Sequence, residues 1–341
     1  MTDGLEILPV RGIGDVTAGD DLAAIISNAA PWLRDGDVLV VTSKIVSKAE
    51  GRLVDVPADG PEREAAREDL LAAETARMVA RRGPTAIVQT HHGFVMAAAG
   101  IDASNVDKTH LVLLPVDPDG SARRLRAALR RRGFDVAVVI SDTMGRAWRN
   151  GLTDVALGAA GIEPFRDHRG QIDPYGNELQ LTQMAVIDEL AAAGELVKGK
   201  MEQVPVAVVR GYPRAGGGDG PGAVALVRDA DSDMFSLGTA EARAAGLRAA
   251  ATLGGGRRGD VNDAAAVDRA LATVAGVLAP GTAITRVDGG TTLRLRPPDT
   301  GAAALIRLGA DAHRLRAALA AEGVTSEALI SDDGLSVRVT T

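Results

Sequence analysis

The chain has 341 residues, a formal net charge of −7 at pH 7 and no cysteine, which excludes disulfides and thiolate metal sites. Its length accommodates one large domain with an appendage or two domains, and its negative charge argues against a sequence-independent grip on nucleic acid. Because there is no signal peptide and no apolar run near the roughly 20 residues that span a bilayer, we expect a cytoplasmic protein with no membrane partner.

The first 60 residues predict two strands and one helix. Residues 5–10 have the apolar pattern of a strand, and the glycine-punctuated loop 11–15 follows them. Apolar residues at helical spacing predict a helix over 21–33. The apolar run 38–42 predicts a buried strand, and the polar stretch 43–48 after it predicts a loop.

The segment from 61 to 141 predicts two helices and four strands. We expect helices over 61–82 and 122–132, and strands over 85–90, 94–99, 111–115 and 136–141. The first two of these strands form a hairpin. The 122–132 helix is rich in arginine, which predicts a solvated helix face or, alternatively, a surface for an anionic ligand.

The remainder of the chain predicts a second, smaller domain. A helix over 183–197 and a strand over 205–209 complete the first domain, which we place at 1–245. Glycine and arginine residues then predict a linker over 246–261. Helical patterns and hairpin strands in 262–341 predict a small α+β domain, whose role the sequence leaves open.

Two acids at strand ends give the strongest signal for a functional site. Asp102 lies in the motif Gly-Ile-Asp-Ala-Ser-Asn and Asp142 in Ser-Asp-Thr-Met-Gly-Arg, each after a strand-like run. Mg²⁺ and Mn²⁺ prefer oxygen ligands and keep water and phosphate oxygens, so one or two carboxylates suffice. If the strand ends are neighbours, the two acids share one ion, Thr143 can reach a second and Asn105 can bind a base or ribose. Alternatively, all four are turn and cap residues.

Basic residues near these motifs suggest phosphate binding. Ser43 and Lys48 follow the 38–42 strand, and Lys44 lies four residues before Lys48, so only one lysine need face a site. Solvated surface lysines are the alternative. Arg146 and Arg149 suit carboxylate or phosphate recognition, or surface pairing with an acid such as Asp154.

One motif is set aside. Gly194–Lys200 has the glycine and lysine spacing of a P-loop, but Met201 stands where a hydroxyl should bind the metal. The preceding residues are helical rather than strand-like in pattern. We therefore predict no P-loop.

Several long strings, in the same order, resemble the coenzyme F-420-0:L-glutamate ligases, most strongly the actinobacterial form. They include Pro-Val-Arg-Gly-Ile-Gly, Ala-Gly-Ile-Asp-Ala-Ser-Asn, Ser-Asp-Thr-Met-Gly-Arg-Ala-Trp-Arg and Asp-Pro-Tyr-Gly-Asn-Glu-Leu, with further matching strings at 35–51, 114–121 and 205–211. The similarity covers roughly residues 5–245. It implies an α+β fold with a mixed sheet, as in the F-420 gamma-glutamyl ligases, and an intertwined homodimer.

The resemblance also implies an activity. Such an enzyme adds L-glutamate to the deazaflavin coenzyme F-420-0 through an acyl phosphate, uses GTP, and releases GDP and phosphate. It would use Mg²⁺ or Mn²⁺, two ions per site, with K⁺ as a further ion. The sequence does not show how many γ-linked glutamates are added. The alternatives are a homologue that binds nucleotide or deazaflavin without turnover, and an amide ligase acting on another acid.

Site residues follow by position from the resemblance. Those expected to contact GTP are Ile13, Gly14, Asp15, Val16, Ser43, Lys48, Asn105 and Gly199. Asp102 and Asp142 would hold one divalent ion, and Thr143 would help to hold the second. Lys48, Asp102 and Asp142 form the expected catalytic set.

Two departures from the family pattern limit which family properties can be assigned to this chain. Archaeal relatives carry Gly-Glu where this chain has Gly199-Lys200; if that glutamate binds the second metal, the Lys200 ammonium partly replaces the ion's charge. Two-domain actinobacterial relatives append a flavin-binding nitroreductase-like domain. The segment after about 260 is too short for it, so we expect no nitroreductase domain and no flavin-dependent reduction.

Overall fold

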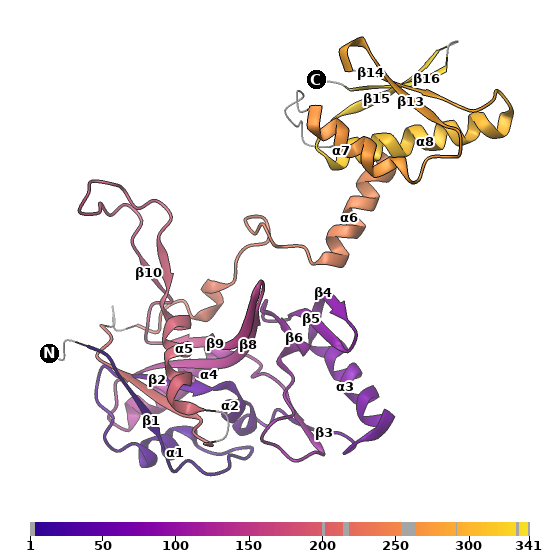
Figure 1. The fold of residues 1–341 in the computed structure, drawn as a ribbon. Coiled ribbons are helices and arrows are strands. Elements are labelled where there is room, and N and C mark those ends of the chain that lie inside the picture. The colour runs from indigo at the N-terminus through magenta and orange to yellow at the C-terminus, as the bar shows by residue number, and fades with distance from the viewer. Residues whose placement is uncertain are drawn as a thin grey trace. The chain divides into compact units, whose positions relative to one another are not determined.

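The computed structural model describes residues 4–199, 202–213, 218–253, 264–290, 292–331 and 334–339. The chain divides into two compact units, residues 1–238 and 239–341, each described here by itself (Figure 1). The predicted boundary at 245 falls inside helix α6 (Thr239–Thr252), which belongs to the second unit. Residues 246–252 of the predicted linker are therefore helical, and 254–261 lie outside the described residues.

The first unit is built on a five-stranded mixed sheet in the order β1-β12-β2-β8-β9. The strands are β1 (Glu6–Val10), β12 (Val206–Arg210), β2 (Val38–Thr42), β8 (Ala137–Arg146) and β9 (Arg149–Ala160). Only β2 and β8 pair in parallel, and the other neighbours are antiparallel. The predicted α+β architecture with a mixed sheet is confirmed.

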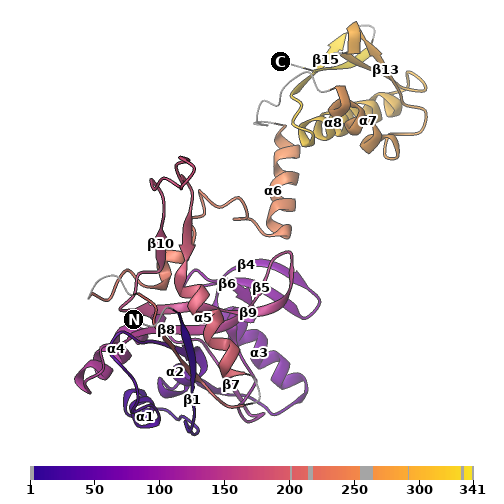
Figure 2. The ribbon, with the colours of Figure 1, turned by 60° about the vertical axis from the view of Figure 1, so that its left-hand side comes forward.

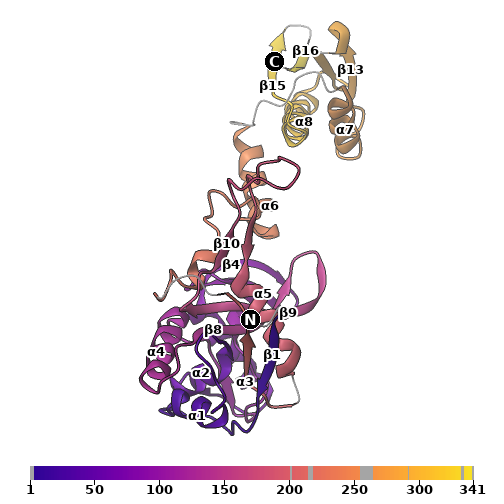
Figure 3. The same cartoon turned by 90° about the vertical axis from the view of Figure 1, so that its left-hand side faces the viewer.

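Helices cover both faces of this sheet. The helices α1 (Leu22–Ala29) and α4 (Pro118–Arg131) pack on one face and α5 (Val186–Lys198) on the other (Figure 3). Alternate residues of β2 fill the two cores: Leu39 and Val41 face α1 and α4, whereas Val38 and Val40 face α5. A strand buried on both faces is a continuous apolar run, which is why β2 was predicted with its observed ends.

Smaller sheets surround the central one. Strands β4 (Thr75–Arg82), β5 (Thr85–Thr90) and β6 (Val95–Ala97) form a three-stranded sheet. The helix predicted over 61–82 ends earlier, since α3 is Gly60–Glu74 and the chain then turns into β4. Residues 75–82 form a strand because they pair with β5, and this pairing contains two register shifts.

Two short pairs complete the first unit. Strand β3 (Leu53–Asp55) pairs with β7 (His110–Val112). Strand β10 (Phe165–Asp167) pairs with β11 (Gln183–Ala185) to form an arm that extends away from the central sheet (Figure 2). Single 3₁₀ turns follow β6, at Ala98–Gly100, and β12, at Ala223–Leu226.

The second unit is itself α+β. Its antiparallel sheet has the order β13-β14-β16-β15, formed by Ala283–Val287, Thr292–Arg296, Gly334–Val339 and Ser326–Ser331. A 3₁₀ turn at Asp288–Gly290 joins the first two strands. Helices α7 (Ala264–Ala275) and α8 (Ala302–Ala321) share one core with the sheet. None of the helices in the described ranges combines the length and apolar composition that a membrane span needs.

The arginines of α4 do not all lie on a solvated face. Arg126 is 3% exposed, and its guanidinium donates to the Val136 carbonyl at 3.1 Å and to Asp219 at 2.7 Å. It also pairs with Asp135 at 3.1 Å. This arginine therefore joins the helix to the start of β8 and to a later loop.

Gly158 in β9 allows close packing of α4 on the sheet. A Cβ atom at this position would lie 2.3 Å from the Pro118 carbonyl oxygen, which is backbone and cannot move aside easily. We expect Gly158→Ala to lower the free energy of unfolding by about 3 kcal/mol. In contrast, Gly145→Ala in the same hairpin places its Cβ 3.8 Å from Leu152 and should be nearly neutral. Denaturant unfolding of both variants measures this, and equal stabilities would contradict the packing argument.

Candidate functional site

The parallel pairing of β2 with β8 brings the carboxyl ends of two strands to one edge of the sheet. Its last pair is Thr42 with Ser141. The chain after Thr42 was predicted as a loop but forms helix α2 (Ser43–Ala49), because Ile45 and Val46 pack into the core. Lys44 and Lys48 are one turn apart and lie on the same face of this helix.

A cavity of about 870 Å³, here called the Lys–Asp cavity, lies at this edge. Both lysines of α2 line it, as do nearly all of the residues that the sequence singled out: Ile13, Gly14, Asp15, Val16, Lys48, Asp102, Asn105, Asp142, Thr143 and Gly199. Ser43, Arg146 and Arg149 do not line it, and Ser43 is 4% exposed at the start of α2.

Asp102 is tied to Lys44 and to its own loop. Its backbone bridges Val112, and its carboxylate lies 2.7 Å from the Lys44 ammonium and accepts from the Ser104 amide at 2.7 Å. Burial favours the neutral acid, but the Lys44 and Ser104 hydrogen bonds prevail and hold the pKa of Asp102 below its usual value. Asp102 is therefore a carboxylate at neutral pH.

Asp142 has the opposite shift. It lies within β8 rather than in a loop after it, so the predicted strand 136–141 was too short. Burial raises the pKa of Asp142 to about 6, and the charges of Asp102 and Asp154 add to the rise, against a hydrogen bond from the Thr143 amide. The protein therefore compensates the negative charge around Asp142 only in part.

A buried ion pair that the sequence did not predict lies beside Thr143. The Lys198 ammonium, at the end of α5, is 2.8 Å from Asp154 in β9, and these residues are 2% and 3% exposed. The hydroxyls of Ser141 and Thr143 donate to the same carboxylate at 2.9 and 2.8 Å. Burial raises the pKa of Asp154, but Lys198 and the hydroxyls outweigh it and lower the pKa.

This pair contradicts one of the two interpretations of Arg146 and Arg149, surface pairing with Asp154. Asp154 is not a surface partner of Arg146 or Arg149, because its carboxylate faces Lys198. Lys198 falls in the P-loop-like stretch, and its place at the end of a buried helix is the sequence signal that could have marked it. Lys200 lies outside the described residues.

The remaining predicted residues frame the cavity. Lys48 donates to the Asn105 carbonyl at 3.2 Å, and Asn105 has a left-handed φ of 54°, which fixes the loop after Asp102. Gly199 ends α5 with a φ of 64°. Within the described ranges, no group of three or more histidine, cysteine, aspartate or glutamate side chains is placed to hold a metal. Any ion here would take its other ligands from substrate and water.

Comparison with known proteins gives consistent matches. The family described as F420-0:Gamma-glutamyl ligase matches residues 12–211. Similar proteins named coenzyme F420:L-glutamate ligase include that of Methanothermobacter thermautotrophicus, 40% identical over 253 residues, which are 68% of this chain and 99% of the relative. The relative from Halobacterium salinarum is 42% identical over 242 residues, covering 66% of this chain and 93% of the relative.

Removing the Lys198 charge should leave a buried carboxylate unpaired. We expect Lys198→Met to lower the free energy of unfolding by about 3 kcal/mol. The double variant Lys198→Met/Asp154→Asn removes both charges yet keeps groups that can bond Ser141 and Thr143, so it should recover more than half of that loss. Denaturant unfolding measures both. A double variant no more stable than the single one would contradict this account of the pair.

The two cavity aspartates should affect stability with opposite signs. The pKa of Asp142 is raised, so its stabilising contribution is present below pH 4 and is lost as the pH rises through about 6. In metal-free buffer, Asp142→Asn should therefore gain about 3 kcal/mol at pH 8 and nothing below pH 4. The pKa of Asp102 is lowered, so Asp102→Asn should lose stability at pH 8. Thermal unfolding across this pH range tests both, and a common sign would contradict the electrostatics.

Proposed function

This chain belongs to the F420-0:gamma-glutamyl ligase family and is an enzyme of that kind, and from this premise we propose that it uses GTP to join L-glutamate to coenzyme F420-0. The single observation that carries the proposal is the Lys–Asp cavity. It gathers the Ile13–Val16 loop, two lysines of α2, Asp142 of β8 and Asp102 of the loop after β6. Lysines suit phosphates and paired carboxylates suit a divalent ion, as nucleotide-driven ligation needs.

The chemistry proceeds in two transfers. A carboxylate oxygen of F420-0 attacks the γ-phosphorus of GTP, the bond from that phosphorus to the bridging oxygen breaks, and GDP leaves. The glutamate amine then attacks the acyl carbon, loses a proton, and inorganic phosphate leaves. Such catalysis consists of positioning and of charge neutralisation rather than covalent chemistry by the protein.

Each part of the cavity has a task in this proposal. The Lys48 ammonium neutralises phosphate oxygens, and its hydrogen bond to the Asn105 carbonyl fixes it beside the loop that carries Asn105. Asn105 and the Ile13–Val16 loop hold the nucleotide. Lys44 keeps Asp102 ionised at neutral pH, and Lys198 with Asp154 orients the Thr143 hydroxyl.

The donor set fits a divalent cation. Asp102 and Asp142 line one cavity, and the raised pKa of Asp142 arises from burial and from neighbouring carboxylates, a charge excess that a cation would relieve. Asp102 and Asp142 would hold one Mg²⁺ or Mn²⁺, and Thr143 would contribute to a second. When bound, these ions polarise the phosphoryl oxygens and neutralise charge that develops in the transfer. We include K⁺ in the proposal as a monovalent activator.

The protein is further proposed to act as a homodimer. The β10–β11 arm extends from the first unit and carries the exposed apolar side chains of Ile172, Tyr175 and Leu181, of which the last is 92% exposed (Figure 2). Apolar side chains on a projecting arm suit contact with another protein surface. Packing against a second copy would cover them.

Removing either cavity carboxylate should abolish ligation. We expect Asp102→Asn and Asp142→Asn to lower the rate of glutamate addition by at least about a hundredfold, because each variant loses a carboxylate that would hold the cation at the phosphoryl group. Purified protein is incubated with F420-0, GTP, L-glutamate and Mg²⁺ or Mn²⁺, with and without K⁺, and products are measured by mass and by GDP release. The exposed Asp69→Asn variant on α3 is the matched control.

The same assay distinguishes the proposed ligase from the two alternative functions. Full activity in either cavity variant, with folding confirmed by circular dichroism, would overturn the assigned roles. Glutamate-dependent GDP release without F420-0 would point to a different acid substrate. Wild-type protein that binds F420-0 and GTP but releases no GDP would be a binding protein rather than a ligase.

A further inference from the structure

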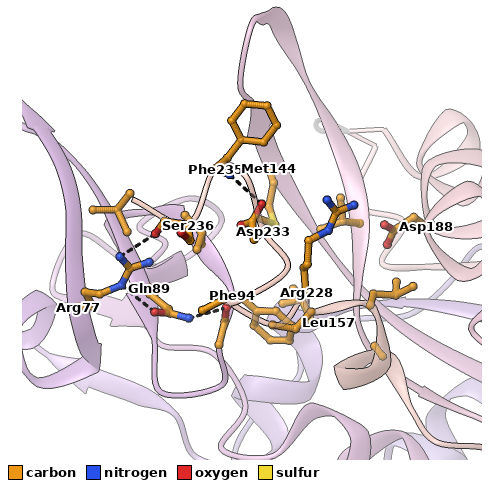
Figure 4. A pocket seen from close by; sticks show the side chains of 18 of the residues that line it. Arg77, Gln89, Phe94, Met144, Leu157, Asp188, Arg228, Asp233, Phe235 and Ser236 are labelled. Atoms are coloured by element: carbon orange, nitrogen blue, oxygen red, sulfur yellow. Dashed lines mark hydrogen bonds between the residues drawn. The ribbon is translucent and has the colours of Figure 1, made fainter. Parts of the chain in front are cut away.

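A second cavity, of about 710 Å³ and here called the apolar cavity, lies against the β8–β9 hairpin (Figure 4). Phe94, Met144, Val155 and Leu157 form its floor, and the segment 223–237 forms the opposite wall. Its volume is in the range of small-molecule sites. Neither the nucleotide nor the metal residues proposed above line it.

The floor of the apolar cavity shares one face of the hairpin with Asp142. Asp142 pairs with Val155 across the antiparallel ladder, and directly opposed residues point to the same face. Met144 is two residues beyond Asp142 in the same strand and lies on that face as well. A molecule on this floor would therefore extend towards the carboxylate that belongs to the Lys–Asp cavity.

The walls of the apolar cavity are held in place by hydrogen bonds. The Asp119 carboxylate accepts from the Ala159 and Ala223 amides at 2.8 and 2.7 Å, which ties the 223–226 turn to β9. On the other side, Arg77 donates to the Gln89 side chain at 3.0 Å and to the Ser236 carbonyl at 2.9 Å (Figure 4). Such a site is largely formed before a ligand binds.

One cation of the apolar cavity is not engaged by the protein. Arg228 is exposed, and within the described ranges its guanidinium has no hydrogen-bond or ion-pair partner. It projects into the cavity from the 223–237 wall (Figure 4). Phe235, 61% exposed, adds an aromatic face on the same wall and contacts Trp148, with ring centroids 4.8 Å apart.

These features favour a flat, largely apolar molecule that carries an anionic group for Arg228. A nucleotide triphosphate fits poorly, because Asp188, Asp231 and Asp233 also line the cavity and would repel it. Aromatic rings bind well between apolar side chains and aromatic faces, and a guanidinium pairs with phosphate or carboxylate.

We propose that the apolar cavity holds the deazaflavin ring of the acceptor, with Arg228 on an anionic group and the reacting carboxylate extending along the hairpin to Asp142. This inference rests on the proposed function. It divides the substrates between two sites on one hairpin: GTP in the Lys–Asp cavity and the acceptor ring in the apolar cavity. Phosphoryl transfer takes place where the two meet.

Binding of F420-0 to the full chain tests the proposal without turnover. The deazaflavin's own fluorescence is titrated with protein in the absence of GTP. Arg228→Glu reverses the cavity cation, and Phe235→Ala removes an exposed ring; both side chains lie outside the core, so the fold should persist. We expect each to weaken F420-0 binding by about tenfold, the loss of one good contact. The KM values for GTP and glutamate should stay within about twofold of wild type.

Matched controls are Arg82→Glu and Leu5→Ala, two exposed side chains that line neither cavity. Wild-type affinity in both cavity variants, or no binding of F420-0 by the wild-type protein, overturns the site. Failure of the proposed function has a different signature: wild-type protein that releases no GDP in the full assay, while the cavity variants still lose affinity for F420-0.

Discussion

The Lys–Asp cavity depends on one topological constraint, the parallel pairing of β2 with β8 within an otherwise antiparallel sheet. Parallel neighbours end at the same edge, so the helix after Thr42 and the strand extension after Ser141 meet there. Because β8 continues past the last pair with β2, Asp142 and Thr143 lie beyond the end of β2 and pair with residues of β9. Lysines and aspartates from distant parts of the chain therefore line one cavity.

The three aspartates at this edge of the sheet differ in whether a lysine pairs with them. Asp102 and Asp154 each have a lysine partner within 2.8 Å, which keeps them ionised, whereas Asp142 has none at that distance in the described structure and its pKa rises to about 6. A buried charge without a partner costs stability. Proteins keep such groups where a ligand supplies the missing charge, as a divalent cation would here.

The β8–β9 hairpin links the two cavities. Ser141 and Asp154 of the hairpin bond to Lys198, which lines the Lys–Asp cavity. Met144 and Val155, on the face that also carries Asp142, form part of the floor of the apolar cavity. The match to the family model covers residues 12–211, so the second unit, residues 239–341, lies outside that match.

The sequence by itself determined the contiguous features: the buried strand β2 with its ends, the hairpin of β5 and β6, the α+β class, the family, and Asp102 and Asp142 as the residues of interest. These are encoded in local patterns of polarity and in short motifs. Tertiary structure decided the rest. It made 43–49 a helix and 75–82 a strand, buried Arg126, kept Ser43 out of the cavity and paired Lys198 with Asp154. Each of these depends on residues far apart in the chain, because hydrogen bonding and burial are satisfied only in the folded structure and leave no local pattern in the sequence.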